Sequence, residues 1–120
     1  MRDNVAALRQ LLLNVPRDAL PMTYQQVASA LALTPPRTIA QVTQALEQSM
    51  REDAVHKAPF IAALVVSRRG EGIPAAGFFE LAVALDRFPR DPALHAAAYR
   101  AEFEGALSQR DDYQCQLSPR

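Results

Sequence analysis

Apolar side chains recur at helical spacing along most of this chain. Between residues 4 and 15 they lie three or four positions apart, and Pro16 follows the last of them. The same spacing returns over residues 23–31, 78–88 and 91–110. A stripe of this kind marks the buried face of an amphipathic helix. The sequence therefore predicts a mainly α-helical protein.

Polar residues mark where the second and third helices begin. Thr23 followed by Gln26 matches the capping box, in which two side chains bond the free N–H groups at a helix start. Thr34 is suited to cap a third helix, with Pro35 at its first position and an end near residue 52. The core-facing positions of this third helix are Ile39, Val42, Ala45, Leu46 and Met50. Two helices joined by the short LTPPRT corner predict a helix-turn-helix.

One apolar run breaks the helical spacing. FIAALVV, residues 60–66, is continuously apolar and lies between Pro59 and the turn sequence SRRGEG, which predicts a buried strand followed by a turn. Ile73 is expected to begin a short returning strand. The whole pattern predicts a mainly α fold with a small β-hairpin: a winged helix-turn-helix core plus a C-terminal helical extension. We expect one domain over residues 1–110 and a flexible tail over residues 111–120.

Length and composition agree with one domain in the cytoplasm. The 120 residues are 49% hydrophobic, enough for one core without metal or disulfide staples. Cys115 is the only cysteine, which excludes an internal disulfide and a multi-cysteine metal site. No stretch approaches the roughly 18 apolar residues of a membrane span, and the first ten residues lack the apolar run of a signal peptide. We expect no membrane partner, no metal and no other cofactor.

The polar face of the third helix has the chemistry that reads base edges. Arginine pairs with guanine O6 and N7, and glutamine with adenine N6 and N7. The candidate side chains share one stripe of the N-terminal half, as a recognition helix requires, and are Arg37, Thr38, Gln41 and Gln44. A solvated helix surface has the same composition. The sequence leaves both interpretations open.

Two further arginines lie in the turn after the apolar run. At a wing tip, Arg68 and Arg69 would meet phosphate or the minor groove, although an ordinary charged hairpin end has the same residues. The charge balance argues against strong DNA affinity, since thirteen basic and thirteen acidic residues cancel. Over residues 23–79 the balance is five basic to four acidic: Arg37, Arg51, Lys57, Arg68 and Arg69 against Glu47, Glu52, Asp53 and Glu71. Such a module lacks a strong positive field for random DNA.

Neither catalysis nor metal binding has a supporting motif. His56 and His95 lie apart, with no serine, cysteine or carboxylate at a spacing typical of a triad or a ligand set. We therefore expect no enzyme. The adjacent Phe78 and Phe79 cannot face the same way on one helix, so one of them is available for a partner surface. A protein-interaction or dimerisation module on the same scaffold is the alternative to DNA binding.

Residues 22–50, less than a third of the chain, resemble a known DNA-binding unit. The region is similar to the DNA-binding half of the alkylguanine-DNA alkyltransferases and alkyltransferase-like proteins. In that family a TYG-x-[VI]-A helix precedes a recognition helix whose arginine, in an R-x-V-G-x-A-L setting, enters the duplex where the damaged base flips out. The matching residues here are Thr23, Tyr24, Val27, Ala28, Arg37, Ile39, Val42, Ala45 and Leu46.

The resemblance ends before the active site of that family. Its Pro-Cys-His-Arg-Val motif has no counterpart, because Pro59 is followed here by Phe60, Ile61 and Ala62. The resemblance therefore implies a winged-helix scaffold and not alkyl transfer. We expect a small bacterial-type, non-enzymatic protein that binds double-stranded DNA through its third helix, or else a protein partner or a second copy of itself.

Overall fold

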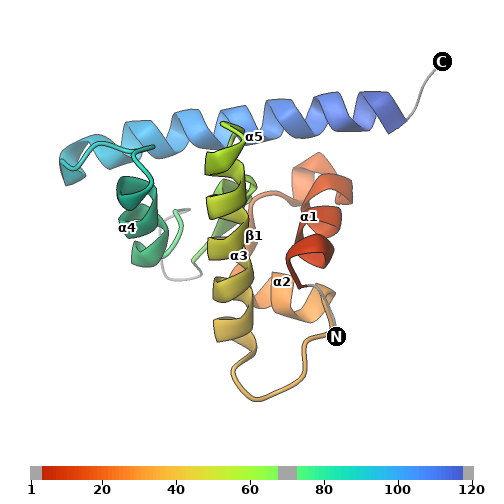
Figure 1. Ribbon diagram of the computed structural model, residues 1–120. Helices are drawn as coiled ribbons and strands as arrows, with labels where there is room; N and C mark the ends of the chain where they lie inside the picture. The colour runs from red at the N-terminus through yellow and green to blue at the C-terminus, as the bar shows by residue number, and fades with distance from the viewer. Residues whose placement is uncertain (1–3, 68–72, 118–120) are drawn as a thin grey trace.

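The computed structural model describes residues 4–67 and 73–117, and these are mainly helical (Figure 1). The described α-helices are α1 (Asn4–Asn14), α2 (Tyr24–Ala30), α3 (Thr38–Val55), α4 (Ala76–Ala84) and α5 (His95–Leu117). The 3₁₀ turns are η1 (Arg17–Ala19), η2 (Ile61–Leu64) and η3 (Pro92–Leu94), and the strands are β1 (Met22–Thr23) and β2 (Val65–Val66). The prediction of a mainly α-helical chain is confirmed.

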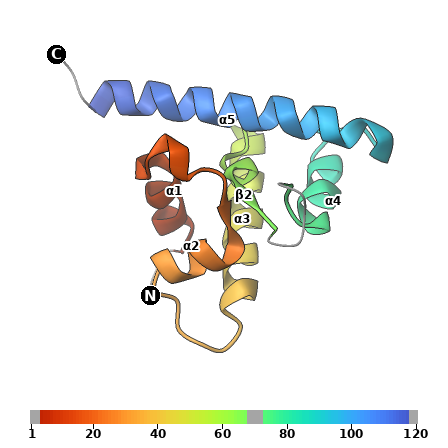
Figure 2. The same cartoon turned by 180° about the vertical axis from the view of Figure 1, so that it is seen from behind.

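Helix α3 stands at the centre of the molecule. Helices α1 and α2 pack against one side of it and α4 against another (Figures 1 and 2). Helix α5 crosses the end at which α3 finishes, and contacts η2 and α1. The loop between α2 and α3 forms the opposite end of the molecule (Figure 1). The α2–α3 loop and the N-terminal end of α3 therefore lie at the end that α5 leaves uncovered.

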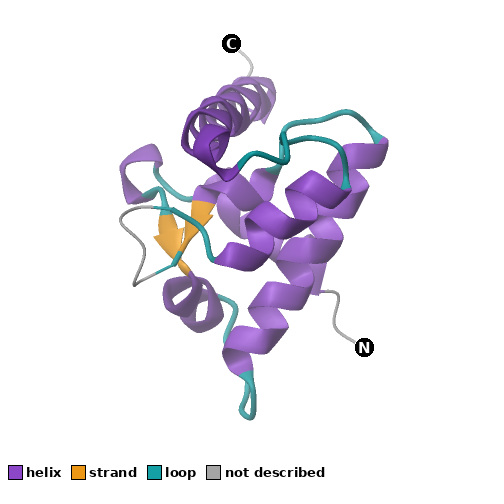
Figure 3. Cartoon of the chain, turned by 90° about the vertical axis from the view of Figure 1, so that its left-hand side faces the viewer, coloured by secondary structure: helices purple, strands orange, loops and turns teal. Residues whose placement is uncertain are grey.

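The two described strands do not form the expected hairpin. Strand β2 pairs with β1 in parallel, with Met22 opposite Val65 and Thr23 opposite Val66 (Figure 3). A parallel pair needs a long crossover, which α2 and α3 provide, whereas a hairpin turn joins antiparallel strands. The N–H of Ser67 donates to the Ile73 carbonyl at 2.8 Å, although Ile73 belongs to no strand. The tip predicted between them lies outside the described residues.

The apolar run over residues 60–66 is fully buried, as predicted, but only its last two residues are strand. Its first part is the turn η2, whose buried backbone groups need partners other than a neighbouring strand. Side chains supply them: Glu102 Oε2 accepts from the N–H of Phe60 at 2.7 Å, and Asp53 Oδ2 from that of Ile61 at 3.1 Å. The Tyr99 hydroxyl donates to the Ala63 carbonyl at 2.9 Å, and burial raises the pKa of Tyr99 to about 12.

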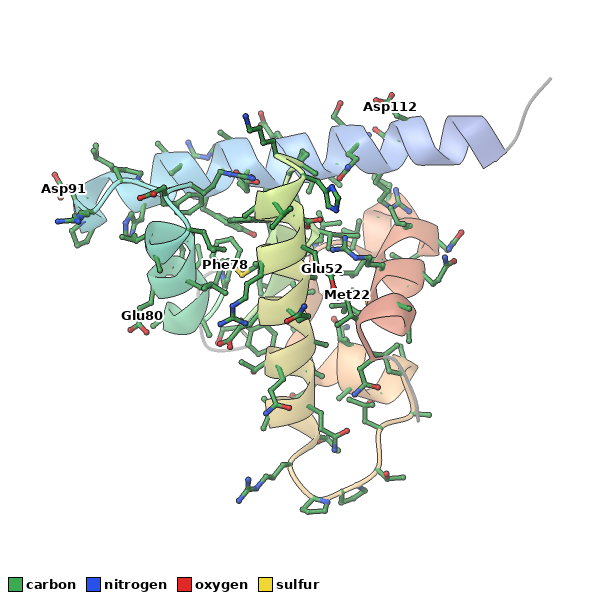
Figure 4. All side chains as sticks on the ribbon, in the orientation of Figure 1. Met22, Glu52, Phe78, Glu80, Asp91 and Asp112 are labelled. Carbon is green, nitrogen blue, oxygen red and sulfur yellow. The ribbon has the colours of Figure 1, made fainter. Side chains whose placement is uncertain are left out.

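Two arginines balance the charges of these acids. Arg87 lies 2.6 Å from Glu102 Oε2, and its guanidinium carbon is 4.2 Å from the centroid of the Phe60 ring. Arg9 of α1 bridges Asp53 and Glu52 of α3 at 3.0 Å each. Figure 4 shows Glu52 on the side of α3 that faces α1. The side chain of Glu102 is only 11% exposed, although glutamate usually lies in solvent.

The predicted cap forms at the start of α2, whereas α3 begins later than predicted, α4 ends at Ala84, and α5 begins only at His95. Both bonds of the capping box form, at 3.1 Å and 2.9 Å. Asp91 Oδ1 accepts from the N–H of Ala93 and so caps the turn η3 that precedes α5. Helix α3 begins only at Thr38, rather than at residue 35, since Pro36 disfavours helical geometry at Pro35. Ile39 then lies in the exposed first turn and is 38% exposed, so its prediction as a core residue was wrong.

Helix α5 continues through Leu117, beyond the expected end of the domain. Arg110 is buried, and its Nε donates to the Leu12 carbonyl at 3.0 Å. Asp111 pairs with Arg17 at 2.6 Å. These contacts hold the C-terminal half of α5 against α1 and η1. Residues 111–117, which the sequence predicts as part of a tail, are therefore helical.

Candidate nucleic-acid interface

Helix α3 carries one polar stripe along its length. Its members follow each other at spacings of four and three residues, which places them on one face of a helix. The distance from the first to the last is about 21 Å at 1.5 Å per residue. We call this set the α3 stripe: Arg37, Gln41, Gln44, Gln48 and Arg51. All are exposed except Gln41, which is half-buried.

The N-terminal half of α3 is the more accessible part of the stripe. It extends past α4 and α1 towards the end of the molecule that α5 does not cover (Figure 1). The C-terminal half has α1 and α4 on either side, and it also carries Glu47 and Glu52. The sequence predicts base-contacting side chains in the N-terminal half of α3. The spacing that these side chains share continues to Arg51.

Arg37 stands just before the first turn of α3 in an unusual backbone conformation. Its φ of 63° and ψ of 42° are left-handed, a region that costs a non-glycine residue about 1–2 kcal/mol. The residue is exposed, and its side chain has no hydrogen bond or ion pair to any other described residue. The structure therefore leaves its guanidinium available to a ligand.

The other predicted readers differ in their surroundings. Gln44 is exposed, whereas Thr38 is half-buried. Nε2 of Gln41 donates to the carbonyls of Thr34 and Pro36, both at 3.1 Å, so its amide is engaged within the loop. Arg68 and Arg69, predicted to contact the DNA backbone, lie outside the described residues.

The charge around α2 and the first half of α3 is more favourable to DNA than the net charge of the chain suggests. All thirteen acidic residues lie outside residues 19–46, which include α2, the loop and the first half of α3. Arg37 is the only charged side chain in this segment. The count over residues 23–79 does not show this, because all four acids of that region lie beyond residue 46. No carboxylate of the segment would repel phosphate at the uncovered end of the molecule.

A shallow groove lies over α2, within this acid-free segment. It has a volume of about 640 Å³ and is lined by Thr23, Gln25, Gln26, Ser29 and Ala30. Hydroxyl and amide side chains of this kind often bond phosphate oxygens in protein–DNA complexes. Thr23 and Gln26 already bond the start of α2. The groove therefore presents hydroxyl and amide groups of β1 and α2, and no charged side chain lines it.

A small cavity lies between α2, α3, η2 and α4. Its volume is about 90 Å³, well below the ~300 Å³ at which ligand pockets begin. Ala62, Tyr24 and Glu47 are among its lining residues. The Tyr24 hydroxyl accepts from the N–H of Ala75 at 3.1 Å. Burial raises the pKa of Tyr24, and the charge of Glu47 adds to this rise, whereas the hydrogen bond from Ala75 lowers the pKa. The cavity is too small for a base flipped out of a duplex.

The two phenylalanines predicted at a partner surface lie in an aromatic cluster. Phe78 is 6% exposed and points towards α3, with Phe60, Phe88 and Tyr99 edge-on to its ring (Figure 4). Phe79 is half-buried and stacks on His95, with ring centroids 5.4 Å apart. The start of α5 thus covers this side of α4. Phe78 has no surface for a partner, and the stacked His95 ring restricts the face that Phe79 offers.

No protein-family model, curated protein or solved structure matches this chain. Among residues 4–67 and 73–117, no helix combines the length and the apolar composition that a bilayer crossing requires. Within the same residues, no three His, Cys, Asp or Glu side chains are grouped closely enough to hold a metal ion. The chemistry available at the uncovered end is therefore that of arginine, amide and hydroxyl groups.

Proposed function

We propose that this protein is a non-enzymatic, cytoplasmic protein that binds double-stranded DNA through α2 and α3. The observation that carries the proposal is the exposed N-terminal half of the α3 stripe, which lies in a segment without a single acidic residue. A recognition helix presents its N-terminal residues to the major groove. The uncovered end of the molecule allows that approach (Figure 1).

Three exposed side chains at the start of α3 have roles in this proposal. Arg37 contacts guanine O6 and N7, or a phosphate, and Gln44 contacts adenine N6 and N7. Ile39, at 38% exposure, is suited to contact a thymine methyl group. Arg51, farther along α3, would lie farther along the same DNA major groove. Arg68 and Arg69 are assigned to the DNA backbone from the sequence alone.

The scaffold proposed for this function is the winged helix-turn-helix. Helices α1, α2 and α3 precede β2 in the order that such a fold requires. The hydrogen bond between Ser67 and Ile73 brings the chain back after β2, as a wing does. The wing would carry Arg68 and Arg69 to the DNA backbone.

The neutral chain sets a limit on affinity. Four arginines are available to phosphate in this proposal, namely Arg37, Arg51, Arg68 and Arg69. With two to four phosphate contacts, the logarithm of the binding constant should fall with the logarithm of salt concentration at a slope of about −2 to −4. Binding should therefore be measurable at low salt and weak at physiological salt.

The test is a titration of a fluorescent mixed-sequence duplex, followed by anisotropy at low and physiological salt. We expect Arg37→Ala to weaken binding about tenfold, because one good base contact is worth ~1–3 kcal/mol. Arg90→Ala is the matched control, an exposed arginine between α4 and η3. It should bind like the wild type. Absence of binding at low salt, or an equal loss in both variants, would contradict the proposal.

A further inference from the structure

The amide of Gln41 faces the loop and not solvent, although the residue belongs to the α3 stripe. Its NH₂ group has two hydrogens, and two carbonyls accept from it: Thr34 O and Pro36 O, at 3.1 Å each. The bidentate contact to adenine needs a free N–H and a free oxygen. Gln41 therefore has no donor left for a base while these bonds hold.

These two bonds complete the ordering of the α2–α3 loop. At the start of the loop, the N–H groups of Ala32 and Leu33 return to the carbonyls of Ser29 and Ala28, at 3.0 Å and 3.2 Å. Beyond them, Pro35 and Pro36 have no N–H to donate. The second half of the loop is consequently held through its carbonyls, and Gln41 is the donor.

Arg37 directly follows this clamped segment. Its left-handed backbone needs support from its surroundings, and its side chain bonds to no other described residue. We propose that Gln41 is a positioning residue, which clamps residues 34–36 and so holds Arg37 in the orientation that enters DNA. Ordering the loop before binding reduces the entropy lost in the complex. This inference rests on the proposed function.

The clamp is measured first in the free protein. Gln41→Met keeps the side-chain length and removes the donor, and Gln44→Met makes the same change at an exposed position of the stripe. Backbone ¹⁵N relaxation at Thr34 and Arg37 should show order parameters falling from ~0.85 to ~0.6 in Gln41→Met only. Circular dichroism and thermal unfolding verify that both variants are folded. Unchanged order at these residues would overturn the clamp.

The positioning role is measured with the DNA duplex and a double-mutant cycle. Gln41→Met should weaken binding about fivefold when Arg37 is present, and change it less than about twofold in an Arg37→Ala background. A residue that contacts DNA itself would give additive losses, as we expect for Gln44→Met. Additive losses for Gln41 and Arg37 would overturn the positioning role.

The two proposals fail in different ways. If the wild-type chain does not bind the duplex at low salt, the proposed function fails and the positioning role fails with it. If the wild type binds and Gln41→Met binds equally well, only the inference about Gln41 is overturned. The relaxation measurement needs no DNA, so it decides on the clamp in either case.

Discussion

At the scale of single residues, the side chains of Asp53 and Glu102 replace the strand partner that η2 and its cap residue Phe60 lack. Glu102 accepts the N–H of Phe60 and pairs with Arg87, so one carboxylate satisfies a backbone donor and a cation together. Arg87 in turn donates to the Ala58 carbonyl at 2.9 Å. Breaking such a network leaves a buried charge without its counter-charge, which costs more than the pair itself contributes. Glu102 is therefore a structural residue of the core.

We expect Glu102→Gln to lower the free energy of unfolding by about 2 kcal/mol, because Arg87 keeps its charge and loses its partner. Glu104→Gln makes the same change two residues along α5, at an exposed position. It should change stability by less than about 0.5 kcal/mol. Urea unfolding of the two variants gives the comparison. Equal losses would show that Glu102 is not part of a buried network.

Asp53 gives a residue-scale prediction about pH. Burial raises its pKa above the ordinary 3.8, although the Ile61 N–H and Arg9 act against the rise. The native state therefore holds this proton more tightly than the unfolded state. Stability from Asp53 is present below pH 3.8 and is lost as the pH rises through the native pKa.

Asp53→Asn has no titratable proton at this position, so its stability should not show the loss with rising pH that Asp53 causes. Its deficit in unfolding free energy relative to the wild type should become smaller between pH 4 and neutral pH. Parallel urea titrations of both proteins across that range measure the deficit. A deficit that stays constant or grows with pH would contradict a raised pKa.

At the scale of elements, three helices end in the same way without glycine. The residues after α2, α3 and α4 have left-handed φ angles of 53°, 56° and 62° at Ala32, Lys57 and Asp86. At each of these ends, the N–H of the left-handed residue and the N–H of the next residue donate to carbonyls near the end of the helix. This pattern is the Schellman motif. Glycine is the usual residue there because it has no Cβ to strain. Each of the three ends consequently stores a small strain.

Ala32→Gly should relieve one of these strains and raise the free energy of unfolding by about 0.5–1 kcal/mol. The gain is partly offset by the greater freedom of glycine in the unfolded chain. Ala101→Gly is the matched control, an exposed site within α5, and should lose about 1 kcal/mol. Thermal unfolding shows whether each variant is more or less stable than the wild type. A loss at both positions would argue against a left-handed Ala32.

At the scale of the whole molecule, a neutral chain separates its charges. Arginines pair with acids of α3 and α5, while the end of the molecule formed by α2, the α2–α3 loop and the first half of α3 is without acids. Net charge alone therefore underestimates how well this end tolerates phosphate.

A single acid placed in this segment should cost much of the DNA affinity. We expect Gln44→Glu to weaken duplex binding about tenfold or more, because its charge would lie against the phosphates. Gln109→Glu adds the same charge on an exposed position of α5 and should bind like the wild type. Anisotropy at low salt measures both. Equal effects would show that the contact surface is not centred on α3.

Local chemistry in the sequence determined much of this protein. The spacing of apolar residues placed α1 and α4, the capping pair Thr23 and Gln26 placed the start of α2, and continuous apolarity placed residues 60–66 in the core. These features depend on neighbours within a few residues of each other. The α3 stripe was also predictable, since its members share one helix.

Only the tertiary structure decided which distant groups meet. The pairing of β1 with β2, the burial of Glu102 and the extension of α5 depend on contacts between residues more than 40 positions apart, such as Phe60 with Glu102. The left-handed turn at Arg37 and the inward amide of Gln41 depend on the path of a loop. Periodicity says which face of a helix is polar. It does not say which of those polar groups form hydrogen bonds within the fold.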